Sequence, residues 1–109
     1  MTSANLHRGE IVAELGGRTW RMGLTLGALA ELEAAFAGAD ILALAEKFET
    51  GRIGASDAIR VLGAGLRGGG NDIADEEVAR LASARGAAGY VETVMRLLTA
   101  TFAPGTGQE

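Results

Sequence analysis

The sequence predicts an α+β domain that is mostly helical, with an N-terminal β-hairpin packed on a bundle of about four to five short helices. Two observations predict this class. Residues 10–15 and 18–24 alternate between apolar and polar side chains, whereas the chain from residue 25 to residue 102 repeats apolar residues at helical spacing. At 109 residues the chain is long enough for one hydrophobic core. We therefore expect a single domain over residues 8–103, with the hairpin at 8–24 and the helices at 25–103.

The hairpin is predicted down to its register. Gly16 and Gly17 separate the two alternating segments, and such a two-residue link suits a primed turn, which needs positive φ. This loop length pairs Ala13 with Trp20, so the apolar faces of both strands coincide and the small residue leaves space for the large one.

The hairpin edges raise a choice between two interpretations. Two strands alone are only marginally stable in water, so the hairpin is expected to lie against the helices. Its outer edges would still present unpaired N–H and C=O groups, which invite a further strand from a second copy or from a partner. The alternative is an edge that its charged residues keep soluble, namely Glu10, Glu14 and Arg21. Both interpretations remain open at the level of sequence.

The helical part is divided by polar capping residues and glycines. The predicted N-caps are Thr25, Asp40, Ser56 and Asp75. The last helix is expected from about Ala88 to Phe102, with an apolar stripe formed by Val91, Val94, Met95, Leu98 and Phe102. Residues 1–7 are expected to be a flexible N-terminus and residues 104–109 a disordered tail.

The stretch Gly63–Gly68 fits the pattern G-x-G-x-x-G, the glycine fingerprint of dinucleotide-binding folds. In those folds the motif follows a strand and opens a helix, whose free N–H groups meet the pyrophosphate. Here the apolar stripe of the preceding residues runs through the motif, so the glycines are expected at the end of a helix. Gly63 and Gly65 would then allow a neighbouring helix to approach closely.

Composition argues against several classes of function. The net charge of −4 lacks the basic stripe that nucleic acids require and disfavours anionic membrane surfaces. The chain has no cysteine and one histidine, His7, so a metal site is not expected. No cofactor motif and no catalytic set stands out, and we expect no enzyme. The absence of a signal sequence and of a long apolar run favours the cytoplasm.

Contacts with other polypeptides are the remaining expectation. Val12, on the outer hairpin face, and Leu97, on the flank of the final helix, are the apolar residues that the predicted core uses least. With Arg21 of the hairpin edge they form the set of candidate partner-binding residues.

Several segments together resemble a known family. "NLHRGEIVAELGGRTWRMGLTLGALAELEAAF", followed by "DILALAEKF", "GLRGGG" and "DEEVARL", resembles the tail assembly chaperone-like proteins of gene transfer agents. These are small phage-derived products encoded among tail genes in alphaproteobacteria. The resemblance runs from about Asn5 to Phe102 and is most specific in the opening, R-G-E and then L-T-L-G-A-L-A-E-L-E.

The resemblance implies a chaperone that works in the cytoplasm of the bacterial host cell. It would bind the tape measure protein and help recruit tail tube subunits, and it could form a homo-oligomer through the hairpin edge. The family offers no catalytic residue to assign. One alternative is a structural tail component that is retained in the particle. A small DNA-binding regulator is another, against which the acidic net charge argues.

Overall fold

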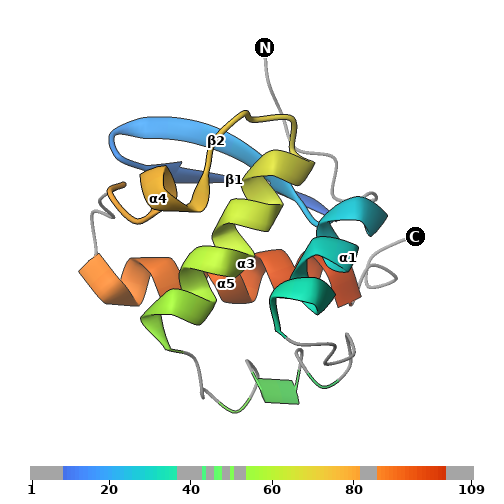
Figure 1. The fold of residues 1–109 in the computed structure, drawn as a ribbon. Coiled ribbons are helices and arrows are strands. Elements are labelled where there is room, and N and C mark those ends of the chain that lie inside the picture. Colours follow the sequence, from blue (N-terminus) through green and yellow to red (C-terminus); the bar gives the residue numbers. More distant parts are fainter. Residues whose placement is uncertain are drawn as a thin grey trace.

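A computed structural model describes residues 9–36, 43, 46–47, 50, 54–81 and 86–102. Two strands and four helices lie in this part of the chain (Figure 1). They are β1 (Glu10–Leu15), β2 (Arg18–Gly23), α1 (Leu26–Ala35), α3 (Ala55–Gly68), α4 (Asp75–Val78) and α5 (Gly86–Phe102). The predicted class, mostly helical with an N-terminal hairpin, is confirmed. Of the helix expected after Asp40, the structure describes residues 43, 46 and 47, which are helical, and its other residues lie outside the described part. Both terminal segments, 1–7 and 104–109, also lie outside the described residues.

The hairpin forms as its sequence predicts. β1 and β2 pair antiparallel, with Ala13 opposite Trp20. Gly16 and Gly17 adopt φ values of 62° and 77°, the left-handed conformation that a primed turn requires. The indole Nε1 of Trp20 donates a hydrogen bond of 2.9 Å to the carbonyl of Leu15, so the one polar group of this buried side chain is satisfied.

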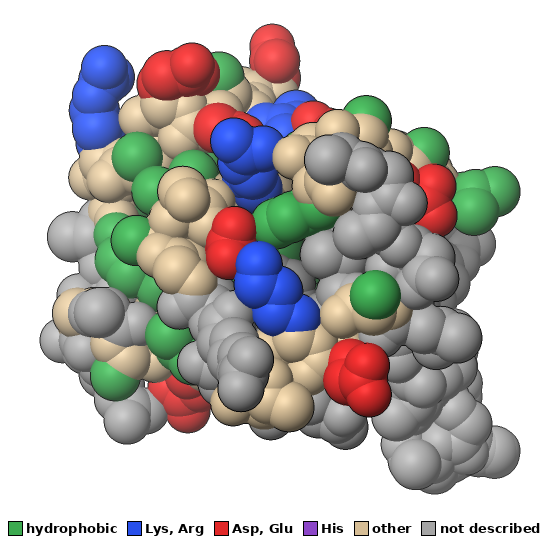
Figure 2. Space-filling view, turned by 60° about the horizontal axis from the view of Figure 1, so that its bottom comes forward, with side chains coloured by type: hydrophobic (Ala, Val, Ile, Leu, Met, Phe, Trp, Pro, Cys, Tyr) green, Lys and Arg blue, Asp and Glu red, His purple; other side chains and the backbone are tan. Residues whose placement is uncertain are grey.

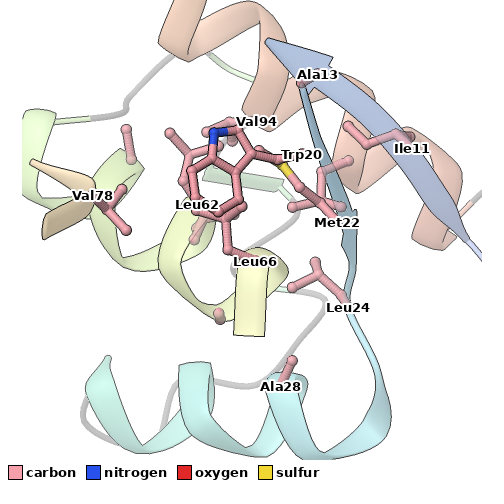
Figure 3. Close-up of a cluster of buried hydrophobic side chains, with 14 of the residues drawn as sticks. Ile11, Ala13, Trp20, Met22, Leu24, Ala28, Leu62, Leu66, Val78 and Val94 are labelled. Carbon is pink, nitrogen blue, oxygen red and sulfur yellow. The ribbon is translucent and has the colours of Figure 1, made fainter. Parts of the chain in front are cut away.

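The hairpin lies as a layer across α3 and α5 (Figure 1), with β2 mainly against α3 and β1 against α5. α1 packs beside α3. Figure 3 shows the side chains of Trp20 and Met22 pointing from β2 toward Leu62 and Leu66 of α3. Met22, Leu62 and Leu66 are all fully buried. The core therefore lies between the inner face of the hairpin and the two long helices.

The glycine stretch of α3 is a packing device. A Cβ atom on Gly68 would lie 2.0 Å from the carbonyl oxygen of Gly23, and one on Gly69 would lie 2.2 Å from the carbonyl oxygen of Arg21. The end of α3 thus touches the backbone of β2, and only glycine fits there. One turn earlier in α3, a Cβ on Gly65 would lie 2.5 Å from Cδ2 of Leu97 in α5. The expected helix end is confirmed, as is the close approach of a neighbouring helix at Gly65.

Two of the predicted N-caps are wrong. Thr25 caps α1 as expected, since its hydroxyl accepts a hydrogen bond of 3.1 Å from the amide of Ala28. α3 begins one residue before Ser56, and its N-cap is Gly54. The carboxylate of Asp57, three residues into the helix, accepts a hydrogen bond of 3.3 Å from the amide of Gly54. This bond satisfies the amide of the N-cap residue, as the third helical residue does in a capping box, whereas Gly54 has no side chain that could bind the first-turn amides.

Asp75 is likewise not a cap, because it is the first residue of α4 and Ala74 precedes it as the N-cap. The acidic side chain still lies in the first turn, where the helix dipole favours it. α5 begins at Gly86, two residues before the predicted start.

The α3–β2 contact makes a direct prediction for stability. Gly68→Ala should lower the free energy of unfolding by about 1–3 kcal/mol, because the new methyl group meets a backbone oxygen that cannot rotate away. Gly27→Ala is the matched control: its Cβ would find only the Thr25 hydroxyl, at 3.8 Å. That change should be neutral or stabilising by up to about 1 kcal/mol. Urea unfolding measures both, and equal effects would contradict the packing argument.

Candidate interaction surface

The structure separates the three predicted contact residues. Val12 and Arg21 face each other across the hairpin, where Val12 is half-buried and Arg21 is exposed. Leu97 is fully buried, with 0% of its surface exposed. The expectation that Leu97 lies outside the core is therefore wrong.

The burial of Leu97 follows from the shape of α3. Because Gly65 carries no side chain, the two helices come close together and the leucine fills the space in front of the glycine. This rotates α5 relative to the predicted stripe. Val94, Leu97 and Leu98 enter the core, whereas Val91 is 40% exposed. The sequence signal for the buried face of α5 is Gly65, a small residue that leaves room for a large side chain of a neighbouring helix.

Both edges of the hairpin are covered at their centre. In an antiparallel pair, every second residue directs its C=O group away from the partner strand. Val12 and Arg21 are such residues. The carbonyl of Arg21 accepts a hydrogen bond of 2.8 Å from Nδ2 of Asn71, and that of Val12 accepts one of 2.7 Å from Nη2 of Arg96. The expectation of unpaired edge groups is wrong for these two carbonyls.

Arg67 connects three parts of the fold. Its Nη1 donates to the carbonyl of Ile73 at 2.9 Å and to the carboxylate of Asp75 at 3.1 Å, while Nη2 donates to the carboxylate of Glu31. This one side chain thus links α3 to α1 and to the segment that leads into α4. Sequence patterns do not indicate this network, since the partners of Arg67 lie 6, 8 and 36 residues away along the chain.

The surroundings of Arg67 also affect its ionisation. Partial burial alone would lower the pKa of its guanidinium, but the hydrogen bonds that it donates to Glu31 and Asp75, and the negative charges of both, outweigh burial and raise the pKa above its ordinary value. Because the pKa of this cation is raised, its charge stabilises the fold at every pH below the ordinary arginine pKa, and the contribution is lost only as the pH rises through the raised pKa of the folded state.

Aromatic rings lie against cations at two places. The guanidinium of Arg18 lies over the Trp20 ring, 4.2 Å from its centroid. Lys47 and Arg60 approach the Phe36 ring at 5.6 and 6.0 Å. Trp20 is 7% exposed, so the ring is a core element covered by a cation rather than an open stacking platform.

The remaining surface is mixed in character. Among the described residues, the exposed large hydrophobic side chains are Leu26, at 84%, and Val91. Leu26 is the first residue of α1 and lies outside the core, whereas Leu32 of the same helix is buried in it. Figure 2 shows acidic and basic side chains interspersed with apolar ones on the face that it presents.

The described part of the chain shows no group of three or more acidic or histidine side chains that could hold a metal ion. None of its helices is long and apolar enough to cross a membrane.

Replacing Leu97 and Leu26 by alanine should separate core from surface. Leu97→Ala removes a fully buried side chain and should cost about 2–5 kcal/mol of unfolding free energy. Leu26→Ala removes the same atoms from solvent and should change it by less than about 0.5 kcal/mol. Thermal or urea unfolding checks both. A Leu97 variant as stable as the wild type would place this residue on the surface after all.

Removing the Arg67 network gives a second prediction. Arg67→Met should destabilise the fold by about 1–3 kcal/mol, because two carboxylates and one carbonyl lose a charged donor. Arg80→Ala, at an exposed position in the turn after α4, should change stability by less than about 0.5 kcal/mol. The cost of Arg67→Met should be constant between about pH 6 and about pH 9, since Arg67 stays charged throughout. A cost that varies within this range would contradict the assignment.

Comparison with known proteins identifies the family. The sequence model described as "Phage tail tube protein, GTA-gp10" matches residues 8–104. No curated protein and no solved structure matches the chain. The match includes both strands and every described helix. It confirms the resemblance to phage-like tail proteins of gene transfer agents, although the matching description names a tail tube protein and not a chaperone. The chain belongs to the phage tail tube protein family GTA-gp10.

Proposed function

We propose that this protein is a structural component of a phage-like tail of the gene transfer agent type and that it is retained in the finished particle. The observation that carries this proposal is the family match, which extends over residues 8–104 and thus over the whole described fold. The proposed role is not enzymatic: the protein acts through the surfaces that it presents to other tail proteins.

The packing of the domain suits such a role. A subunit that repeats in a particle must present the same surface in every copy. The glycines at the end of α3 hold the helix directly on the β2 backbone, and Arg67 fixes α1 and the start of α4 to the same helix. These contacts leave little freedom between the hairpin and the helices, so the described surface is well defined.

The second candidate is a tail assembly chaperone that binds the tape measure protein, helps recruit tube subunits and then leaves. One observation favours it. Permanent interfaces have an extended apolar core, whereas transient interfaces are about as polar as the rest of the surface. The described residues expose two large hydrophobic side chains, Leu26 and Val91, among interspersed charges. Such a surface suits a temporary partner better than a permanent one.

Quantitative mass spectrometry of purified particles distinguishes the two candidates. A structural component should be present in a fixed ratio to the major tail proteins through successive purification steps. An abundant host protein serves as the carry-over control and should fall toward zero. A chain that falls with this control, while its gene deletion still abolishes tails, would overturn the structural proposal in favour of the chaperone.

A further inference from the structure

The two edges of the hairpin are closed to different degrees. The edge of β2 is covered by the end of α3, where Gly68 and Gly69 touch the strand backbone and Asn71 occupies the carbonyl of Arg21. No further strand fits there without moving a helix. At the centre of the β1 edge, by contrast, the covering group is the side chain of Arg96.

The Arg96 side chain can also leave the β1 edge easily. Arg96 is exposed, and its hydrogen bond to the Val12 carbonyl involves one end of a long side chain. Because this hydrogen bond is exposed, water can replace it and its net contribution to stability is small. The amide of Val12 and the backbone groups of Glu14, two residues along, face the same edge. In the part of the chain that the structure describes, no group outside the hairpin hydrogen-bonds to them.

Side chains on β1 indicate what kind of strand would fit. Glu10, Val12 and Glu14 alternate along the strand on the face away from the core, so they read acidic, apolar, acidic. The fullest antiparallel pairing with a second copy of β1, centred on Val12, would set Glu10 opposite Glu14 of the other copy. Like charges directly opposite each other destabilise a strand pair. A basic, apolar, basic segment would instead place opposite charges together.

We propose that the β1 edge accepts an extended segment of a partner protein whose side chains alternate basic, apolar, basic, and that this segment displaces the Arg96 side chain. Strand addition supplies main-chain hydrogen bonds at Val12 and Glu14, and the two carboxylates select the sequence. Arg96 keeps the edge protected until such a segment arrives.

A blocked peptide of sequence Lys-Thr-Val-Thr-Lys tests the proposal, with Glu-Thr-Val-Thr-Glu as its matched control. Titrated into the isotope-labelled full chain, the basic peptide should shift the amide NMR signals of Val12 and Glu14, with a Kd on the order of 1 mM. The acidic peptide should not shift them. No change at Val12 and Glu14 with the basic peptide, or equal changes with both peptides, would overturn the proposal.

Three substitutions make the test specific. Val12→Pro removes an amide that points away from β2, so it should abolish binding and leave the hairpin paired. Thr19→Pro makes the same change on the β2 edge and should leave binding intact. Arg96→Ala should tighten binding by about two- to fivefold, whereas Arg80→Ala, which removes the same charge elsewhere, should not.

Glu14→Lys serves if the proline variant fails to fold. This exposed side chain is not part of the core, and reversing its charge leaves one acidic and one basic position on the edge, so the preference for the basic peptide should disappear. An unchanged preference would overturn the proposal. Peptide binding and retention in the particle are measured separately, so either can fail without the other.

Discussion

The contact between the end of α3 and the backbone of β2 determines the rest of this fold. Two glycines allow the helix to touch the strand, and the apolar face of the hairpin then closes directly on Leu62 and Leu66. One turn before the end of the same helix, Gly65 leaves room for Leu97 and so sets the position of α5. One helix therefore positions both of its large neighbours through places where it has no side chain. The pattern that resembles a phosphate-binding motif is better explained by steric fit than by ligand chemistry.

Polar contacts also fix the helices and the hairpin relative to one another. Arg67 joins the start of α4 and the middle of α1 to α3, and Asn71 and Arg96 each occupy a carbonyl of the hairpin. These bonds lie at the surface or half-buried, so each adds modest stability. Their larger effect is on arrangement, because they connect elements that the core alone would leave free to shift. A domain with few aromatic residues gains definition from such links.

Features that depend on residues close together in the chain were predicted from the sequence, whereas features that depend on distant residues were not. The hairpin and its register follow from neighbouring residues, namely the diglycine and the alternation around it, and were predicted correctly. The face of α5 depends on Gly65, some thirty residues away, and periodicity within α5 could not reveal it. The same holds for the candidate surface: Val12 and Arg21 lie where expected, but their carbonyls are covered by side chains 84 and 50 residues away. The predicted N-cap of α3 was wrong for another reason: the helix begins one residue before Ser56, and Asp57 in its first turn binds the amide of Gly54.

The geometry around Arg67 means that lysine cannot replace this arginine without loss of contacts. Its acceptors are a carbonyl and two carboxylates that lie on different elements, and they are reached by separate nitrogens of one planar group. A lysine would bring a single ammonium on a flexible stem. This group lacks the planar fork of a guanidinium and cannot reach the same three acceptors together. Two sequences that differ only in this residue would carry the same net charge and yet hold their helices together differently.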